Sequence, residues 1–316
     1  MALIFSMPSL SAAVRVHISD GINNDFVKTR MEQSMSAILS EVNAAVIGGR
    51  DINLGSMNIS PEVKESVSML WDNTPFVCNE QVIERHCLTM KNGYQVRNIP
   101  LTLCPREAEL LSDNDKYQEA VFSFDRQGRM ESFFLTIKNN LYMNVINSNK
   151  SETDLMRRQM ILEYVEHFRT SYNQKDIKFL NQVFSDDAII ITGHVIQQRR
   201  RDGFKLPDRI EYKSQSKQEY LDKLKHVFAA NKSIRVVFDE VEVSRHPVNN
   251  NFYGVTLHQG YTSDRYHDEG YVFLLWDFTD ENQPQIHVRT WQPDQFNGKK
   301  LPKDKVFEIN DFDIEK

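Results

Sequence analysis

The sequence predicts an α+β fold in which three helices pack against a curved antiparallel sheet in the C-terminal part of the chain. Residues 155–192 indicate a long helix, a short helix and a buried strand in direct succession. Residues 234–291 contain four runs of β-branched and aromatic residues separated by short turn clusters, a pattern typical of an antiparallel meander. Helices that precede such a meander are expected to cover one face of its sheet.

The first helix carries apolar side chains at spacings of three and four residues, on one face: Ile161, Tyr164, Val165, Phe168 and Tyr172. The charged residues expected outside this face are Arg157, Arg158, Glu163 and Glu166. Asp176 is the expected N-cap of the second helix, whose inner face is Ile177, Leu180 and Phe184. Residues 185–187 should end that helix before a strand at 188–191.

Ser216 and Glu219 have the form of a capping box that opens the third helix. Its expected inward residues are Tyr220, Leu221, Leu224, Val227 and Phe228. The predicted strands of the meander are 234–243, 252–261, 266–277 and 285–291. Between Arg199 and Lys213, six basic residues stand against three acidic ones, a net charge of +3. We interpret this segment as a solvated loop; the alternative is a docking surface for an acidic partner.

The motifs SDDAIIITG, after the second helix, and HVRTWQP, at the end of the last strand, resemble the nuclear transport factor two-like superfamily, also described as the SnoaL-like or cystatin-like cone. The resemblance covers about half of the chain. The longer strings LEYVEHFRTSYNQKDIKFLNQVFSDDAIIITG and EGYVFLLWDFTDENQPQIHVRTWQPD resemble a group of uncharacterised two-domain proteins from gut Bacteroidales. The fold implied hosts enzymes, binding domains and dimerisation domains, so it does not assign a reaction.

Residues 21–147 are expected to form a smaller N-terminal α+β domain. One helix ends at Gly48-Gly49 and a second begins at Ser60-Pro61. Two hairpins follow, one closed at Asn92-Gly93 and one around residues 125–128. Helices followed by hairpins repeat the order of the C-terminal domain, which suggests a divergent, shortened copy. Residues 148–154 are the expected linker, and residues 155–316 form the second domain with a C-terminal tail.

An apolar run from Ala2 to Leu10, followed by Ser11-Ala12-Ala13, is typical of the end of a secretory signal. Residues 1–20 are therefore interpreted as a truncated signal segment, and the protein as exported to the periplasm or cell envelope. The alternative is a frayed N-terminal strand.

All three cysteines lie in the N-terminal domain, and three cysteines cannot form a disulfide framework. A two-residue loop at Asn92-Gly93 would place Cys87 opposite Asn98 and Cys104 opposite Gln81. Cys78 is then the remaining partner for a disulfide with Cys104. The alternative is that all three are small buried side chains.

Charge and motif content exclude several classes of protein. The net charge of −6 and a pI of about 5.9 disfavour nucleic-acid binding. No run approaches the roughly 18 apolar residues of a membrane span. The histidines His246, His258 and His267 lack the spacing of a metal site, and no phosphate loop is present. We therefore expect no metal and no cofactor.

The resemblance also permits a test for one known chemistry. In the steroid-isomerase branch of the superfamily, a tyrosine on the first helix polarises a carbonyl and an aspartate after the first strand removes the adjacent proton. Alignment on DIKFLNQVFSDDAIIIT puts Phe168 and Thr192 at those two positions. Neither side chain can play its part, so this mechanism is not expected.

Other polar residues can line the cone. Alternation along 285–291 places His287, Arg289 and Trp291 on one face, and the adjacent strand offers Glu269 and Tyr271. His194, after the first strand, is expected near the same mouth. Together these residues would suit an anionic or carbohydrate-like ligand. The alternative is that this face is exposed to solvent or to a second copy of the chain.

Two functions therefore remain open. The preferred one is a non-catalytic ligand-binding or assembly protein of the cell envelope, with a small ligand, an envelope protein or a homodimer formed through the exposed sheet as its partner. The second is an enzyme of unassigned reaction centred on His287, Arg289 and Glu269. The two differ in whether these three side chains share a cavity.

Overall fold

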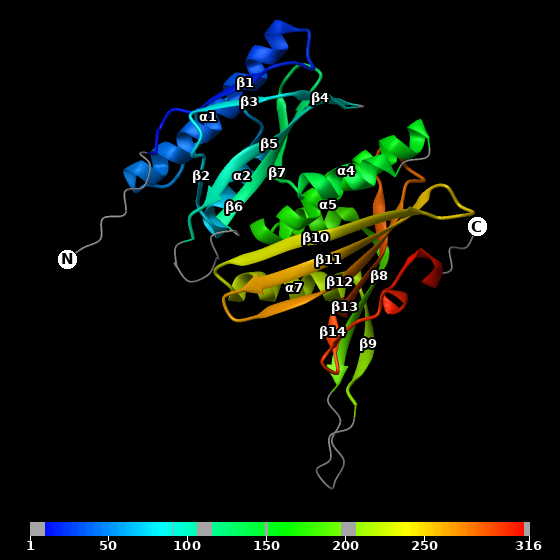
Figure 1. The fold of residues 1–316 in the computed structure, drawn as a ribbon. Helices are drawn as coiled ribbons and strands as arrows, with labels where there is room; N and C mark the ends of the chain where they lie inside the picture. Colours follow the sequence, from blue (N-terminus) through cyan, green and yellow to red (C-terminus); the bar gives the residue numbers. More distant parts are fainter. Residues whose placement is uncertain (1–9, 91, 106–115, 149–150, 197–206, 313–316) are drawn as a thin grey trace, which may run out of the picture. The chain divides into compact units, whose positions relative to one another are not determined.

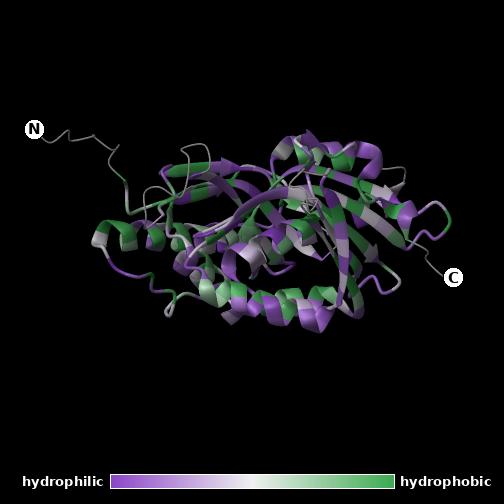
Figure 2. Cartoon of the chain, turned by 90° about the horizontal axis from the view of Figure 1, so that it is seen from below, coloured by the Kyte–Doolittle hydropathy of each residue, from purple (hydrophilic) through white to green (hydrophobic). Residues whose placement is uncertain are grey.

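The computed structural model describes residues 10–90, 92–105, 116–148, 151–196 and 207–312. The chain divides into two compact units, Met1–Thr136 and Ile137–Lys316 (Figure 1). This division lies before the helix at 139–147, whereas the sequence-based boundary lay after it. In both units the helices alternate between hydrophobic and hydrophilic residues along their length, as amphipathic helices do (Figure 2).

In the first unit, a short strand and two helices precede an antiparallel sheet. Its elements are β1 (Arg15–Ile18), α1 (Asp25–Gly48), α2 (Pro61–Asn73), β2 (Phe76–Val77), β3 (Val82–Arg85), β4 (Cys87–Thr89), β5 (Gly93–Leu103), β6 (Tyr117–Asp125) and β7 (Met130–Leu135). The sheet has the order β2-β5-β6-β7, and β4 also pairs with β5. α1 ends at Gly49, which is left-handed with φ of 59°, and Ser60 caps α2. Both helix ends agree with the prediction.

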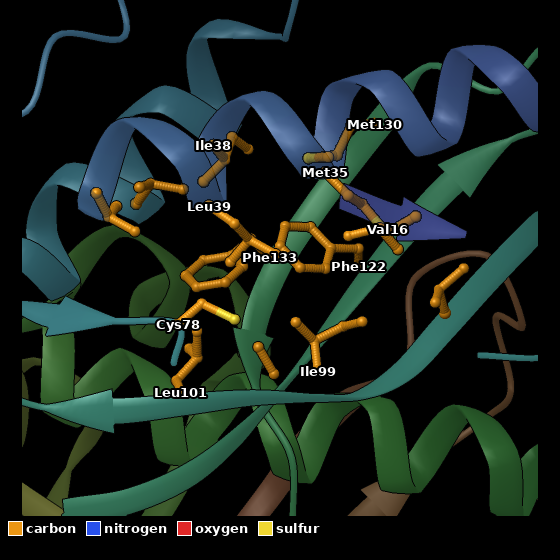
Figure 3. Close-up of a cluster of buried hydrophobic side chains, with 14 of the residues drawn as sticks. Val16, Met35, Ile38, Leu39, Cys78, Ile99, Leu101, Phe122, Met130 and Phe133 are labelled. Atoms are coloured by element: carbon orange, nitrogen blue, oxygen red, sulfur yellow. The ribbon is translucent and has the colours of Figure 1, made fainter. Parts of the chain in front are cut away.

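The core of the first unit lies between α1 and the sheet. Figure 3 shows Ile38 and Leu39 of α1 above Phe122 of β6 and Phe133 of β7. The two phenyl ring centroids are 5.0 Å apart. Burial of these large side chains provides most of the free energy that holds α1 on the sheet. That this unit is a divergent copy of the second stays a prediction.

The start of the described chain belongs to this core. β1 pairs in parallel with β3, and Val14, Val16 and Ile18 are buried. Residues 14–18 are therefore part of the folded unit, although the sequence interpretation placed residues 1–20 in a signal segment. Most of the apolar run on which that interpretation rests, residues 2–9, lies outside the described residues.

The hairpin register differs from the prediction. Thr89 pairs with Tyr94 and Cys87 with Val96, so opposing positions sum to 183, whereas a loop at Asn92-Gly93 would require 185. Gly93 belongs to β5, where a Cβ atom would lie 1.8 Å from the Phe124 carbonyl oxygen. Cys87 consequently does not face Asn98, and Cys104 donates its backbone N–H to Pro75 rather than facing Gln81.

The three cysteines are free thiols, so the Cys78–Cys104 disulfide is not formed. Cys78 and Cys87 are buried, and burial raises the pKa of each thiol to about 11. These two residues act as small apolar side chains of the core.

The second unit contains helices packed on a six-stranded sheet. Its elements are α4 (Asn139–Asn147), α5 (Glu152–Gln174), α6 (Ile177–Val183), β8 (Phe184–Ile196), β9 (Arg209–Ser216), α7 (Lys217–Ala230), β10 (Ile234–Arg245), β11 (Phe252–Ser263), β12 (His267–Asp277), β13 (Gln285–Pro293), β14 (Gln295–Phe296), β15 (Lys299–Lys300), η1 (Lys303–Lys305) and η2 (Ile309–Asp311). The sheet order is β10-β11-β12-β13-β8-β9. The four-strand meander is confirmed, and β8 joins it in parallel to β13.

The predicted polar loop is in part a strand. Residues 209–216 form β9, which pairs with β8 along the edge of the sheet. Its side chains are largely exposed, which is why its polar sequence gave no strand signal. The basic residues at 199–205 lie outside the described residues.

The predicted caps of the second unit are confirmed. Asp176 accepts the Phe179 backbone N–H at the start of α6, and Ser216 with Glu219 forms the capping box of α7. Two details differ. Phe184 begins β8 instead of ending α6, and Val227 is exposed although it was expected to face inward.

Arg158 and Glu166 are buried, contrary to the prediction that they lie outside the helix packing. Arg158 Nε donates to Asp154 Oδ2 at 3.0 Å, and the Tyr253 hydroxyl donates to Asp154 Oδ1 at 2.9 Å. Glu166 accepts the Ile137 backbone N–H at 2.9 Å. A helix-face pattern counts charged residues as exposed, but α5 is covered on more than one side, and its buried charged groups have hydrogen-bond partners.

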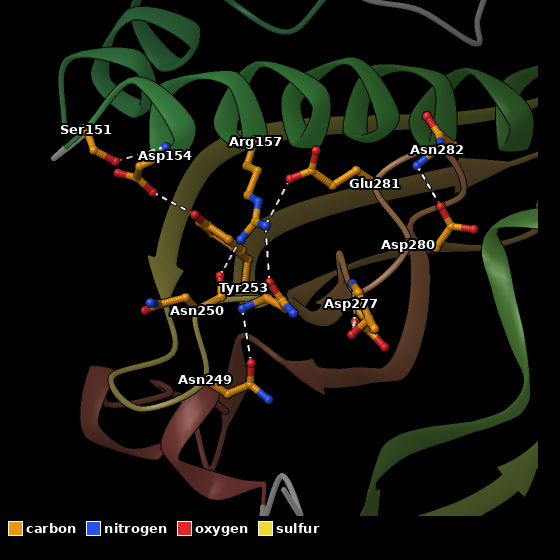
Figure 4. A network of polar contacts seen from close by, with 12 residues as sticks. Ser151, Asp154, Arg157, Asn249, Asn250, Tyr253, Asp277, Asp280, Glu281 and Asn282 are labelled. Atoms are coloured by element: carbon orange, nitrogen blue, oxygen red, sulfur yellow. Dashed lines mark hydrogen bonds and ion pairs between the residues drawn. The ribbon is translucent and has the colours of Figure 1, made fainter.

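A second polar network fixes the beginning of α5 to the strand turns. Arg157 donates to the Asn250 carbonyl and to Asn251, and it forms an ion pair of 3.0 Å with Glu281 (Figure 4). Because the turns β10–β11 and β12–β13 both supply acceptors, α5 is held across the end of the meander.

We call the sheet face that packs on α5, α6 and α7 the inner face, and the opposite one the outer face. Val272, Leu274 and Trp276 belong to the inner core, and Phe273, Leu275 and Val288 to the outer one. The outer face is covered by the C-terminal segment 301–312, which lies across the sheet from the helices (Figure 1). Phe312 stacks on Phe273 with ring centroids 5.1 Å apart.

This cover corrects the expectation of an exposed aromatic sheet. Tyr271 is only 5% exposed, and Gln292 beneath the segment accepts the Phe307 N–H at 2.7 Å. Gly254 permits the close approach, since a Cβ atom there would lie 3.0 Å from Ile309 Cβ. Among the described residues, none of the helices has the length and apolar character needed to cross a membrane.

Candidate functional site

A β-bulge in β13 divides the predicted pocket residues between the two faces of the sheet. Leu275 and Trp276 of β12 pair with Val288 and Ile286, so His287 is the extra residue of β13. Arg289 pairs with Leu274, and Trp291 packs against the inner core. Alternation placed His287 with Arg289 and Trp291, but one inserted residue reverses the side on which the chain before it points.

His287 lies with residues of the outer face. Its ring is near Phe252, and its two nitrogens are 3.4 Å from Asp187 Oδ1 and 3.3 Å from Asp277 Oδ2. Glu269 and Tyr271 share the outer face with each other, as predicted, but not with Arg289. His194 is exposed on β8. The structure therefore does not bring His287, Arg289 and Glu269 together.

The inner face carries a different polar cluster around Arg289. The guanidinium carbon lies 5.3 Å from the ring centroid of Tyr220 on α7, and the Tyr220 hydroxyl is hydrogen-bonded to that of Tyr172 on α5. Asp268 of β12 and Tyr261 of β11 complete the group. We call these five residues, Tyr172, Tyr220, Tyr261, Asp268 and Arg289, the inner cluster.

Local structure explains how the five residues meet. Tyr172 is in the last turn of α5, which ends at Lys175 with φ of 61°. Tyr220 follows the capping box of α7, which fixes where that helix begins. Asp268 pairs with Tyr261 across the two strands, and Arg289 points inward because it pairs with Leu274 on the inner face. Two helix ends and three strands thus meet at one end of the cone.

Burial dominates the electrostatics of the inner cluster. It raises the pKa of Tyr172 well above its ordinary value and that of Tyr261 to about 12. Burial also raises the pKa of the Asp268 carboxyl. For Arg289, burial opposes the charge, but Tyr220 and Tyr172 outweigh it, and the pKa of Arg289 rises. The inner cluster therefore contains the charged Arg289 guanidinium, neutral phenols and the Asp268 carboxyl with its raised pKa.

Several polar atoms of the inner cluster lack hydrogen-bond partners within the described part of the chain. They are Arg289 Nε, Asp268 Oδ1 and the Tyr261 hydroxyl. Arg289 is only 5% exposed, and a buried guanidinium with an unused donor is unfavourable unless something accepts from it. The exposed Tyr266 lies beside Tyr261, with ring centroids 6.2 Å apart, so the cluster reaches the surface at the β11–β12 turn.

Sequence reasoning found Arg289 but missed its companions. Tyr172 and Tyr220 were assigned to apolar helix faces, and Asp268 and Tyr261 to strands without a role. A signal was available in the sequence: these apolar positions carry tyrosine, although phenylalanine would fill the same space. A buried phenol needs a hydrogen-bond partner for its hydroxyl, so tyrosine there indicates a polar neighbour. Phe168 is fully buried and Thr192 pairs with Trp291, so neither supplies the missing isomerase groups.

Comparisons with known proteins add little on function. No protein-family model and no curated protein matches the chain. Among solved structures, it is similar to Bd1075 of Bdellovibrio bacteriovorus (TM-score 0.34, 13% identity, 65% of this chain and 78% of that one). It is similar to an NTF2-like protein of Cytophaga hutchinsonii (0.33, 12%, 43% and 98%) and to naphthalene 1,2-dioxygenase (0.36, 9%, 52% and 93%). At these TM-scores the similarities assign no activity.

Proposed function

We propose that the second unit is a binding domain for a small organic anion, held by Arg289 in the interior of the cone. The supporting observation is the buried Arg289 guanidinium with its unused Nε donor. A carboxylate is the ligand class that an arginine fork binds best, because two parallel hydrogen bonds can form. The phenols of Tyr172 and Tyr220 can donate to the same oxygens.

The test is a thermal-shift screen of the full chain against matched pairs of carboxylates and their neutral amides, such as benzoate and benzamide. We expect at least one carboxylate, but not its amide, to raise the melting temperature in a saturable way. Arg289→Met should abolish the shift. The exposed Arg245→Met serves as the control and should keep it. If no carboxylate stabilises the protein, or if both variants respond alike, the proposal is wrong.

An enzyme is the second candidate, now supported by a different residue from those the sequence suggested. Burial raises the pKa of Asp268, and a carboxyl with a raised pKa close to buried phenols is suited to proton transfer. The check is the pH titration of the Asp268 carboxyl carbon by NMR. A midpoint at or below the ordinary value of about 3.9 would remove this candidate.

The cellular location, the family membership and the oligomeric state are proposed from the sequence. We propose export to the cell envelope from the apolar run at 2–10, and membership in a Bacteroidales group from the quoted strings. We also propose that the protein has a non-catalytic role and forms a homodimer. Because segment 301–312 covers the outer face around Tyr271, a dimer would have to use another surface or the edge strand β9. Sedimentation velocity over a range of concentrations tests the dimer.

A further inference from the structure

The outer face holds a cluster of potential metal ligands that is separate from the inner cluster. His258 of β11, Glu269 of β12 and Asp294, just after β13, each offer one ligand atom, and these atoms lie within 4.8 Å of one another. His258 Nε2 is 3.8 Å from Asp294 Oδ2. The three residues come from three neighbouring strands, so no sequence spacing could show them.

His258 is prepared to act as a ligand. Its side chain is 9% exposed, and its Nε2 has no hydrogen-bond partner within the described residues. Its Nδ1 is 2.6 Å from Asp239 Oδ1. A carboxylate at Nδ1 holds the proton there and leaves the Nε2 lone pair free, which is the arrangement found behind metal-binding histidines.

The position of Asp239 depends on a local irregularity. The pairing of β10 with β11 shifts between Phe238 and Glu240, so Asp239 is the inserted residue of a β-bulge. Bulges redirect single side chains, often next to functional sites. Here the bulge brings a carboxylate to the back of the His258 ring.

The remaining ligands are positioned by the backbone. Asp294 donates its N–H to the Glu269 carbonyl at 3.2 Å, and the Asp294 carbonyl accepts the Leu301 N–H. Asp294 is buried, whereas the Glu269 side chain is half exposed and can rotate. A tetrahedral zinc ion bound at about 2.1 Å would need its ligand atoms roughly 3.4 Å apart, so a small rotation of Glu269 suffices.

The surroundings favour a cation. Glu240 and Glu242 line a neighbouring cavity of about 90 Å³ that also contacts His258 and Tyr271, and the exposed Lys303 on its edge is 4.0 Å from Glu242 Oε1. Lys300 lies close to Tyr271, Glu240 and Asp294. Lys300 is fully exposed and can move away when a doubly charged ion binds.

We propose that His258, Glu269 and Asp294 form a zinc-type divalent metal site, with Asp239 as the positioning residue behind His258. One nitrogen and two carboxylate ligands suit a first-row transition ion better than magnesium. Three protein ligands leave at least one coordination position for water or a ligand. The ion would join β11, β12 and the chain after β13.

The experiment is calorimetric titration of the untagged full chain, first stripped with a chelator, with zinc chloride and separately with magnesium chloride. We expect one zinc per chain, much weaker magnesium binding and a higher melting temperature with zinc. His258→Gln and Glu269→Gln should each weaken zinc binding at least tenfold, and Asp239→Asn by about 10–100-fold. The exposed His226→Gln is the matched control and should bind as the parent does.

The proposal is wrong if there is no saturable zinc binding, if Glu269→Gln binds zinc with unchanged affinity, or if His226→Gln loses as much affinity as the ligand variants. Glu269 is exposed, so its variant should fold even if His258→Gln does not. Magnesium binding as tight as zinc would exclude the histidine nitrogen as a ligand. The anion screen proposed for Arg289 uses the inner face and is independent of each of these results.

Discussion

Arg289 of β13 lies with its guanidinium carbon 5.3 Å from the ring centroid of Tyr220 on α7, although the two residues are far apart in the sequence. The contact exists because Arg289 pairs with Leu274 on the inner face, whereas the bulge at His287 places His287 on the other side of the sheet. It places a buried cation among the phenols of the inner cluster and Asp268, and cation–π contact alone compensates little of the desolvation.

Replacing Arg289 should separate stability from binding. We expect Arg289→Met either to lower the free energy of unfolding by less than about 1 kcal/mol or to raise it. The reason is that a buried charge with incomplete hydrogen bonding contributes little net stability. Leu274→Ala, at the paired position, should cost about 2–5 kcal/mol through the cavity that it leaves. Urea unfolding measures both. A loss above about 3 kcal/mol in Arg289→Met would identify Arg289 as a structural residue.

His167 should make the protein less stable in mild acid. It stacks on Phe179, with ring centroids 3.7 Å apart, and burial lowers its pKa to about 4. The unfolded chain, with an ordinary histidine pKa of about 6.5, then binds more protons between pH 6.5 and 4. Stability is therefore complete above pH 6.5 and falls as the pH drops through this window, by at most about 1.4 kcal/mol per unit.

His167→Phe should remove this dependence. Between pH 7.5 and 5 the parent should lose up to about 2 kcal/mol more than the variant, measured from urea midpoints at the two pH values. The comparison with the variant is needed because carboxylates with lowered pKa values, such as Asp187 and Asp264, also titrate in acid. Parallel curves for the two proteins would show that His167 is charged in the folded state or is not buried.

Gly254 should control the C-terminal cover of the sheet. A methyl group there would lie 2.8 Å from Phe273 Cε2 and 3.0 Å from Ile309 Cβ. We expect Gly254→Ala to cost about 1–3 kcal/mol, typical of overpacking, and to expose segment 301–312. Limited proteolysis followed by mass spectrometry should show faster cleavage in 301–312. Gly48→Ala, which meets only ordinary contacts, is the control, and an equal response would contradict this role of Gly254.

The helices and the meander could be predicted from the sequence because their signals are local. The caps Asp176 and Ser216 act within three residues, and the strand runs are bounded by turn residues. The edge strand β9 could not, because an exposed strand carries no hydrophobic alternation. The burial of Arg158 was missed for a related reason, since the partner that neutralises it is known only once Asp154 and Tyr253 are in place.

The sequence by itself determined the α+β class, the order of the long helices and the meander strands, and the presence of Arg289 in the last long strand. The tertiary structure decided which side chains meet. Two single-residue bulges, at Asp239 and His287, set which side chains lie on each face, and they depend on strand pairing across the sheet. Tyr172, Tyr220 and Asp268 join Arg289, and His258 joins Asp294, because residues distant in sequence become neighbours only when the strands pair and the helices pack on the sheet.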